Sequence, residues 1–168
     1  AGRSSRREGA VVIVPRWERM LAAFLLLVGA CSPVERPRDA THPTIVSLNP
    51  CTDAVLAEVA EPAQLLAISH YSHDPRATSM PLGEARRFPA TGGPVEEVLA
   101  LDPDIVVAGA FLPPATAQAL ERLGIRVETF GIAGDLAENA AQVRRLAALA
   151  GRPERGETLV ERIDAALA

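Results

Sequence analysis

The 168-residue chain is predicted to be an α/β protein, a single Rossmann-like lobe with a parallel sheet flanked by helices. Three observations predict this class. Short β-branched runs alternate with amphipathic runs, an order typical of parallel sheets covered by helices on both faces. The first of these strand-like runs, TIVSL (44–48), is β-branched and apolar, as expected of a strand buried on both faces. The composition is that of a globular domain, with 48% hydrophobic and 23% charged residues.

The elements follow one another in an alternating order along the second half of the chain. Strands are predicted where apolar runs are bounded by turn residues, and helices where apolar residues recur every three or four positions. The predicted strands are residues 44–48, 64–69, 104–110 and 125–130. The predicted helices are residues 53–60, 95–101, 115–124 and 135–150, and a last one that begins near Pro153. The polar segment 70–94, broken by Pro and Gly, is predicted to be a long loop with a functional role.

The front end of the chain is predicted to be an export signal. The uncharged apolar stretch 21–30 is too short to span a bilayer and follows two arginines, which is typical of a signal peptide. The segment LVGAC that ends at Cys31 resembles the lipobox of bacterial lipoproteins, and this resemblance implies lipid modification of Cys31. The predicted organisation is a signal and lipobox region (1–31), a Pro-rich tether (32–43), an α/β lobe (44–151) and the start of a further helix (152–168).

The composition and the motifs exclude several classes of function. The net charge of −4 offers no basic surface for a nucleic acid. The chain contains no lysine, which rules out Schiff-base chemistry and the lysine of a P-loop. It also lacks the motifs G-x-G-x-x-G, G-x-S-x-G and H-E-x-x-H. We therefore expect a binding protein without a cofactor of its own, not an enzyme.

Ligands of open α/β sheets bind beyond the carboxyl ends of the strands. Tyr71, the only tyrosine, and Phe111 both fall in loops that follow predicted strands. Side chains of this type are suited to form a wall for a large apolar or ring-shaped ligand. Ordinary packing at the end of the sheet is the alternative interpretation.

The turn SLNPCTD after the first strand admits a purely structural interpretation. Asn49 is predicted to be the N-cap of the following helix, and Pro50 suits the first helical position. Asp53 is predicted to complement the positive end of the helix dipole.

Two chemical alternatives use the cysteine of the same turn. Cys51, His70 and His73 are residue types that bind zinc, so a direct Zn or Mn receptor or chaperone is one alternative. The other is a thiol enzyme, in which a histidine activates Cys51 at a helix N-terminus.

Longer stretches resemble the N-terminal lobe of periplasmic substrate-binding proteins that serve ABC importers of cobalamin, ferric siderophores and haem. These stretches are TIVSLNPCTDAVLAEVAEPAQLLAISHYSHDP (44–75), GGPVEEVLALDPDIVVAG (92–109) and LERLGIRVETF (120–130). The most specific match is VEEVLALDPDIVVAG, because in that family a helix leads through L-x-P-D into the strand that ends at the ligand cleft. The family joins two α/β lobes by one long helix. The resemblance thus implies that the run from Pro153 begins this helix and that the second lobe is absent from this chain.

The resemblance also implies a function and a set of contacts. The chain would be a periplasmic lipoprotein, lipid-anchored to the membrane, that captures a metal chelate and delivers it to an ABC permease. Which chelate is bound, cobalamin, a ferric siderophore or haem, stays open. Glu96 would pair with arginines of the permease. The implied ligand contacts are Ser47, Asn49, His70, Tyr71, Ser72, Thr91, Gly92, Ala110 and Phe111.

Overall fold

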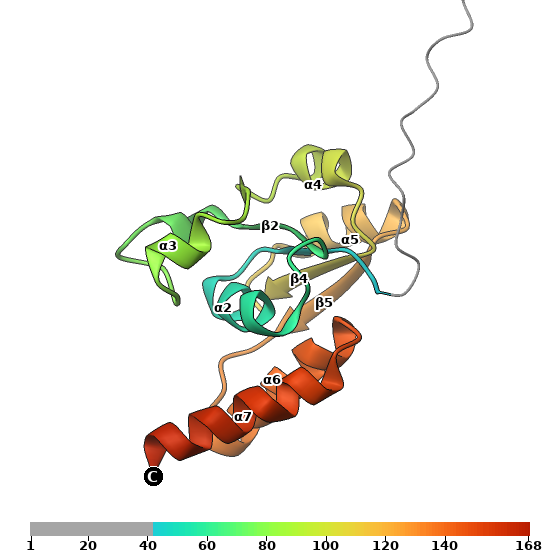
Figure 1. Cartoon of the computed structure of the whole chain (residues 1–168). Helices are drawn as coiled ribbons and strands as arrows, with labels where there is room; N and C mark the ends of the chain where they lie inside the picture. Colours follow the sequence, from blue (N-terminus) through green and yellow to red (C-terminus); the bar gives the residue numbers. More distant parts are fainter. Residues whose placement is uncertain (1–41) are drawn as a thin grey trace, which may run out of the picture. The chain divides into compact units, whose positions relative to one another are not determined.

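A computed structural model of the chain describes residues 42–168 (Figure 1). The predicted signal peptide, the lipobox with Cys31 and most of the tether lie outside the described residues. In the described part, five parallel strands form one sheet in the order β3-β2-β1-β4-β5. This arrangement confirms the predicted α/β class with a parallel sheet. The strands are β1 (Ile45–Ser47), β2 (Leu65–Ser69), β3 (Ala90–Thr91), β4 (Ile105–Gly109) and β5 (Arg126–Phe130).

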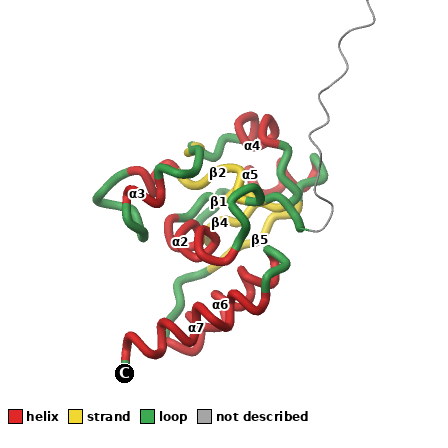
Figure 2. Tube along the Cα trace, viewed as in Figure 1, coloured by secondary structure: helices red, strands yellow, loops and turns green. Residues whose placement is uncertain are grey.

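Helices cover both faces of the sheet (Figure 2). Helices α2 and α6 pack on one face, with α7 packed against them, and α4 and α5 pack on the other. None of the helices between residues 42 and 168 has the length and apolar character needed to cross a membrane. The helices are α2 (Pro50–Val59), α3 (Leu82–Ala85), α4 (Val95–Leu101), α5 (Pro114–Arg122), α6 (Leu136–Leu149) and α7 (Pro153–Leu167), and a 3-10 turn, η1, spans His70–His73.

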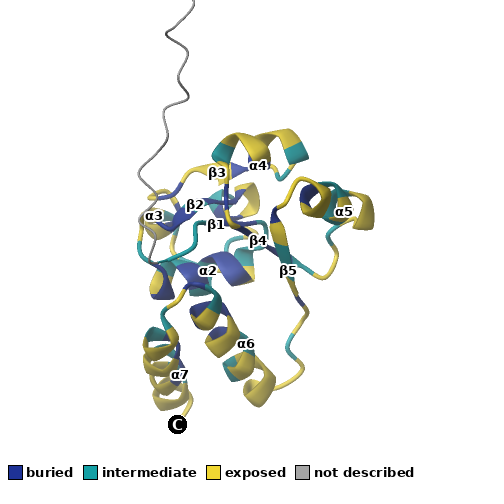
Figure 3. Cartoon of the chain, turned by 90° about the vertical axis from the view of Figure 1, so that its right-hand side faces the viewer, coloured by how far each residue is buried: buried dark blue, intermediate teal, exposed yellow. Residues whose placement is uncertain are grey.

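The central strands β1 and β4 are mostly apolar because both of their faces are buried, as Figure 3 shows for the centre of the sheet, whereas the edge strand β5 carries the exposed residues Arg126 and Thr129. Along β4, Ile105 and Val107 join the cluster under α2 and α6, while Val106 joins the cluster under α4 and α5. The period of two in a strand puts neighbouring residues into different layers. The two apolar clusters thus lie on opposite faces of the same sheet. The loops at the ends of the strands are not part of these clusters and can form a site.

The motif Asp102-Pro103-Asp104 before β4 fastens that strand to the beginning of β1. The Asp104 carboxylate accepts hydrogen bonds from the Thr44 backbone N–H at 2.7 Å and from the Thr44 hydroxyl at 2.9 Å. In return, the Asp104 backbone N–H donates to the Thr44 hydroxyl oxygen at 3.1 Å. This reciprocal pair sets the register of the two central strands, so the motif has a structural role.

The segment 70–94 is more structured than the sequence indicated. It contains the turn η1 and the short helix α3, and its last residues form β3 at the edge of the sheet. The prediction of one long loop is wrong because β3 is too short to show a strand pattern. Its pairing with β2, Ile68 to Ala90 and Ser69 to Thr91, is a tertiary interaction that the local sequence does not show.

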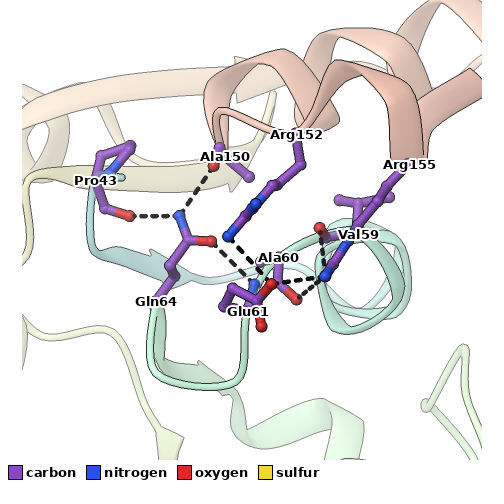
Figure 4. A network of polar contacts seen from close by, with 8 residues as sticks. All are labelled: Pro43, Val59, Ala60, Glu61, Gln64, Ala150, Arg152 and Arg155. Atoms are coloured by element: carbon purple, nitrogen blue, oxygen red, sulfur yellow. Dashed lines mark hydrogen bonds and ion pairs between the residues drawn. The ribbon is translucent and has the colours of Figure 1, made fainter. Parts of the chain in front are cut away.

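A polar network joins the end of α2 to the start of α7 (Figure 4). The Arg155 guanidinium donates to the backbone carbonyls of Val59 and Ala60, both at 3.3 Å, and to Glu61 Oε1 at 2.6 Å. Gln64 lies beside this cluster and its Nε2 donates to the Ala150 carbonyl oxygen at 2.9 Å. The carbonyls at a helix C-terminus lack intrahelical partners, and Arg155 supplies them for α2.

Replacing Arg155 by Ala is expected to lower the free energy of unfolding by about 1–3 kcal/mol, because partly buried carbonyls lose their donor. The matched control is Arg162→Ala, which removes an exposed pair between α7 and Glu58 of α2 and is expected to cost less than about 1 kcal/mol. Urea unfolding of both variants provides the measurement. Equal losses in the two variants would contradict the role given to Arg155.

Candidate functional site

The carboxyl ends of β1, β2, β3 and β4 lie side by side at one edge of the sheet, because all paired strands are parallel. After β1 the chain forms β2 on one side of β1, and later it forms β4 on the other side of β1. Such a change of direction is the point where ligands bind in open α/β sheets. Every predicted contact residue lies at the end of one of these four strands or in the loop that follows it. They are Ser47, Asn49, His70, Tyr71, Ser72, Thr91, Gly92, Ala110 and Phe111. We call this edge the rim.

At the centre of the rim, Asn49 lies directly against Gly109. Asn49 Oδ1 accepts a hydrogen bond from the Cys51 backbone N–H at 2.8 Å, which confirms Asn49 as the N-cap of α2. A Cβ atom on Gly109 would lie only 2.6 Å from Asn49 Nδ2. The glycine thus leaves space for the Asn49 amide between the ends of β1 and β4.

Two exposed aromatic side chains stand on either side of this centre. Tyr71 follows β2 and is 54% exposed, and Phe111 follows β4 and is 84% exposed. The strands that carry them are separated by β1 and so lie about 10 Å apart. The His70 ring packs against Tyr71 with 4.0 Å between the ring centroids, and His70 Nδ1 donates to the Thr91 carbonyl oxygen at 3.3 Å. The rim therefore presents apolar surface around a polar centre.

Three predicted contact residues are buried beneath the rim. Ser47 and Ser72 have no exposed surface and Thr91 is 4% exposed. The Thr91 hydroxyl donates to Glu97 Oε2 at 2.7 Å, and it accepts from the Gly93 backbone N–H at 3.1 Å. The expectation that these three side chains touch a ligand is corrected accordingly, because their hydroxyl groups bond within the protein and support the exposed residues.

The two glutamates at the start of α4 differ in their surroundings. Glu97 Oε2 also accepts from the Gly92 backbone N–H at 3.0 Å. Hydrogen bonds from the Thr91 hydroxyl and from Gly92 lower the pKa of Glu97 from its usual value. Glu96 is exposed, and its side chain makes no hydrogen bond or ion pair with the described residues. Glu97 thus holds the loop after β3, while Glu96 has its carboxylate available to a partner.

Asp53 has a role that its sequence position did not reveal. It is fully buried, and its Oδ2 accepts from the Ser69 backbone N–H at 3.0 Å and from the Ser72 hydroxyl at 2.6 Å. Oδ1 has no hydrogen-bond partner among the described residues. Burial raises the pKa of Asp53 to about 7, and neighbouring hydroxyl and backbone N–H groups oppose the rise without cancelling it. In the first turn of α2, the Asp53 carboxyl group is thus bonded to the end of β2 and to η1, in addition to its position near the positive end of the helix dipole.

The structure does not assemble the alternative metal site. His70 donates to the carbonyl oxygen of Thr91, and His73 Nε2 donates to that of Ala85 at 3.1 Å. Within residues 42–168, no three His, Cys, Asp or Glu side chains are grouped as metal ligands. The prediction of a direct Zn or Mn site at His70, His73 and Cys51 is wrong.

Cys51 is exposed, and its sulfur lies 3.8 Å from the Ser79 hydroxyl oxygen. No hydrogen bond joins it to either histidine ring in the part of the chain that the structure describes. The pairing of thiol and base that the alternative of a thiol enzyme requires is not formed here.

Comparison with known structures gives the fold a wider context. A periplasmic haem-binding protein from Pseudomonas aeruginosa is 26% identical, with a TM-score of 0.61 over 73% of this chain and 44% of that one. The vitamin B12 binding protein BtuF of Vibrio cholerae is 23% identical, with a TM-score of 0.60 over 76% of this chain and 49% of that one. The haem-binding protein HutB of Vibrio cholerae is 17% identical, with a TM-score of 0.60 over 73% and 46%. The two likenesses below 25% identity show the fold alone.

In each of these comparisons, the aligned region covers less than half of the solved structure. No curated protein matches the chain. A family model described as "Periplasmic binding protein" matches residues 45–168, which include the whole sheet, the rim and both final helices. The chain therefore belongs to the periplasmic binding protein family.

Proposed function

We propose that this chain is the substrate-binding part of an ABC importer and that it captures a metal chelate, such as cobalamin, a ferric siderophore or haem. The observation that carries the proposal is the rim, where two exposed aromatic residues flank the polar centre formed by Asn49. A large, ring-shaped ligand can cover Tyr71 and Phe111 together, because the strands that carry them are about 10 Å apart. The chelator holds the metal, so the protein needs no ligating cluster of its own.

The relatives support the choice of ligand class. The solved structures include proteins named for haem and for vitamin B12, which are both metal chelates with a large ring. In our proposal, the ligand lies between this rim and a second lobe, as the resemblance described above implies. Binding to this chain alone is then weaker than binding to a two-lobed protein, because half of the contact area is missing.

Glu96 is proposed to dock on the permease. It is exposed at the start of α4, next to the rim, and its carboxylate is not engaged within the described residues. Glu97, by contrast, is used internally by Thr91 and Gly92. An arginine of a membrane partner would pair with Glu96 without disturbing the loop after β3.

The location that we propose is the periplasm, with a lipid anchor on Cys31. The support is the apolar stretch 21–30 followed by LVGAC. A Cys31→Ala variant expressed in a bacterial host is the corresponding test: it should lose the lipid and leave the membrane fraction.

The function is tested by titrating the protein with hemin, cyanocobalamin and ferrichrome and following ligand absorbance or tryptic protection. We expect one of these chelates to bind, and the double variant Tyr71→Ala/Phe111→Ala to lose at least about tenfold in affinity, as is usual when buried aromatic contacts are removed. The matched control is Leu123→Ala. Leu123 is as exposed as Tyr71, at 54%, but it precedes β5 and so lies at the opposite edge of the sheet.

Failure of all three chelates to bind, or an equal loss in the control variant, would overturn the proposed function. Tight binding of free zinc without a chelator would point to a different class of cargo.

A further inference from the structure

One buried carboxyl group holds the turn that carries the exposed aromatic pair. Asp53 lies in the first turn of α2, and a single oxygen, Oδ2, accepts from Ser69 at the end of β2 and from Ser72 in η1. Tyr71 lies between these two donors in the sequence. The position of the Tyr71 ring on the rim thus depends on a group that is itself inaccessible to a ligand.

The hydrogen bonds around Asp53 indicate its protonation state. Oδ2 accepts two hydrogen bonds, whereas Oδ1 is buried and has no hydrogen-bond partner among the described residues. A buried carboxylate oxygen without a donor destabilises the charged form, so this arrangement favours a protonated carboxyl group.

Within residues 42–168, no positively charged side chain is bonded to Asp53, and the α7 arginines that reach α2 bind the carbonyls of its last turn and Glu58 instead. The strands packed nearby, β1, β2 and β4, contain only apolar residues, serine and glycine. Its own helix contributes Cys51, which is exposed, and Glu58, which pairs with Arg162. The turn η1 contributes His70 and His73, but both rings donate to backbone carbonyls. An uncompensated buried charge is costly, and opening the turn to water relieves that cost.

We propose that Asp53 is a positioning residue whose neutral carboxyl group holds the Tyr71 turn in place, and that loss of its proton loosens the turn and lowers the affinity of the rim for its ligand. The statement about affinity rests on the proposed function, whereas the statement about the turn does not. The transition falls near pH 7, where burial places the pKa of Asp53.

The protonation state is tested directly by infrared spectroscopy. At pH 6 the ordinary carboxyl groups are ionised, so the unaltered protein should show a band of a protonated carboxyl group that disappears by pH 8.5 and is absent from Asp53→Asn at both pH values. A spectrum without this band at pH 6 would overturn the proposal.

The turn is followed by the ring signal of Tyr71 after 13C-tyrosine labelling, since the chain contains one tyrosine. We expect this signal to shift between pH 6 and 8.5 in the unaltered protein and in His70→Gln, but not in Asp53→Asn. Asn mimics the neutral acid, because its oxygen can accept from Ser69 and Ser72 and its amide can donate toward Ser47. A shift that persists in Asp53→Asn and vanishes in His70→Gln would assign the effect to His70 and overturn the proposal.

The consequence for binding is measured as the ratio of the dissociation constants at pH 8.5 and pH 6, with hemin and cyanocobalamin as the probes. The ratio should be about tenfold in the unaltered protein, the value for one pKa unit of coupling between proton and ligand, and close to one in Asp53→Asn. A ratio that is the same in both proteins overturns the coupling. If neither probe binds at either pH, the proposed function fails, and the infrared band and the Tyr71 signal still decide the role of Asp53.

Discussion

At pH 8.5, Asp53→Asn is expected to be more stable than the unaltered protein, by at most about 4 kcal/mol. Burial raises the pKa of Asp53 from 3.8 to about 7, so the folded protein keeps a proton that the unfolded chain has released. The stability that this proton provides is complete below pH 3.8 and is lost as the pH rises through 7. The Asp53→Asn variant has no proton to lose at this position, so its free energy of unfolding does not fall for this reason as the pH rises. Urea unfolding at several pH values between 4 and 9 provides the measurement.

The matched control is Asp74→Asn. Asp74 is a partly exposed aspartate just beyond the same turn. Hydrogen bonds from the Arg76 side chain and backbone lower the pKa of Asp74, so its contribution has the opposite sign and is lost as the pH falls. We expect Asp74→Asn to differ little from the unaltered protein at pH 8.5, because this pair is solvent-exposed. A difference between the Asp53 variant and the unaltered protein that does not grow from pH 4 to pH 8.5 would contradict a neutral, buried Asp53.

The sequence predicted the main elements because they are governed by local patterns. The strand β4 reads as a continuous apolar run. Asp135 is the N-cap of α6, and its carboxylate accepts from the Glu138 backbone N–H, a pairing that the local sequence Asp-x-x-Glu favours. The gathering of Tyr71 and Phe111 at one edge also followed from the sequence, since alternation of strands and helices requires parallel strands. These features depend on the spacing of apolar residues and on the order of strands and helices, and both can be read directly from a sequence.

What the sequence did not reveal depends on contacts between distant residues. Ser47 and Ser72 were predicted to touch a ligand because they are polar and follow strands, but polarity does not show on which side of a loop a hydroxyl group lies. Asp53 stands at a position where a solvated carboxylate is the usual expectation. Its burial arises only because Ser69 and Ser72, which are 16 and 19 residues further along, provide its hydrogen bonds.

The rim and the final helix are connected through α2. Its N-cap Asn49 and Asp53 of its first turn shape the rim, while its last turn is bound by Arg155 of α7. In a two-lobed protein of the kind proposed, α7 would lead toward the second lobe. The rigid attachment of α7 to α2 and α6 then fixes the direction in which that lobe lies relative to the rim.

Gly156→Ala is expected to separate α6 from α7 and to cost about 1–3 kcal/mol of unfolding free energy, as overpacking does. A Cβ atom on Gly156 would lie 2.6 Å from the Ala147 Cβ and 3.5 Å from the Arg144 Cα, and neither atom can move without its helix. Gly83→Ala is the control, because nothing lies within 4 Å of its Cβ position, and it should be neutral or stabilising by up to about 1 kcal/mol through helix propensity.

A double-mutant cycle with Ala147→Gly shows whether this one contact is responsible. Removing the Ala147 methyl group makes room for the new Cβ, so Gly156→Ala should cost nothing in the Ala147→Gly background and should regain up to about 1 kcal/mol of helix propensity. The coupling energy between the two sites is then about 1–4 kcal/mol, above what independent sites show. Additive effects of the two substitutions in urea unfolding would mean that α6 and α7 are not in this close contact, and the attachment of α7 described above would have to be abandoned.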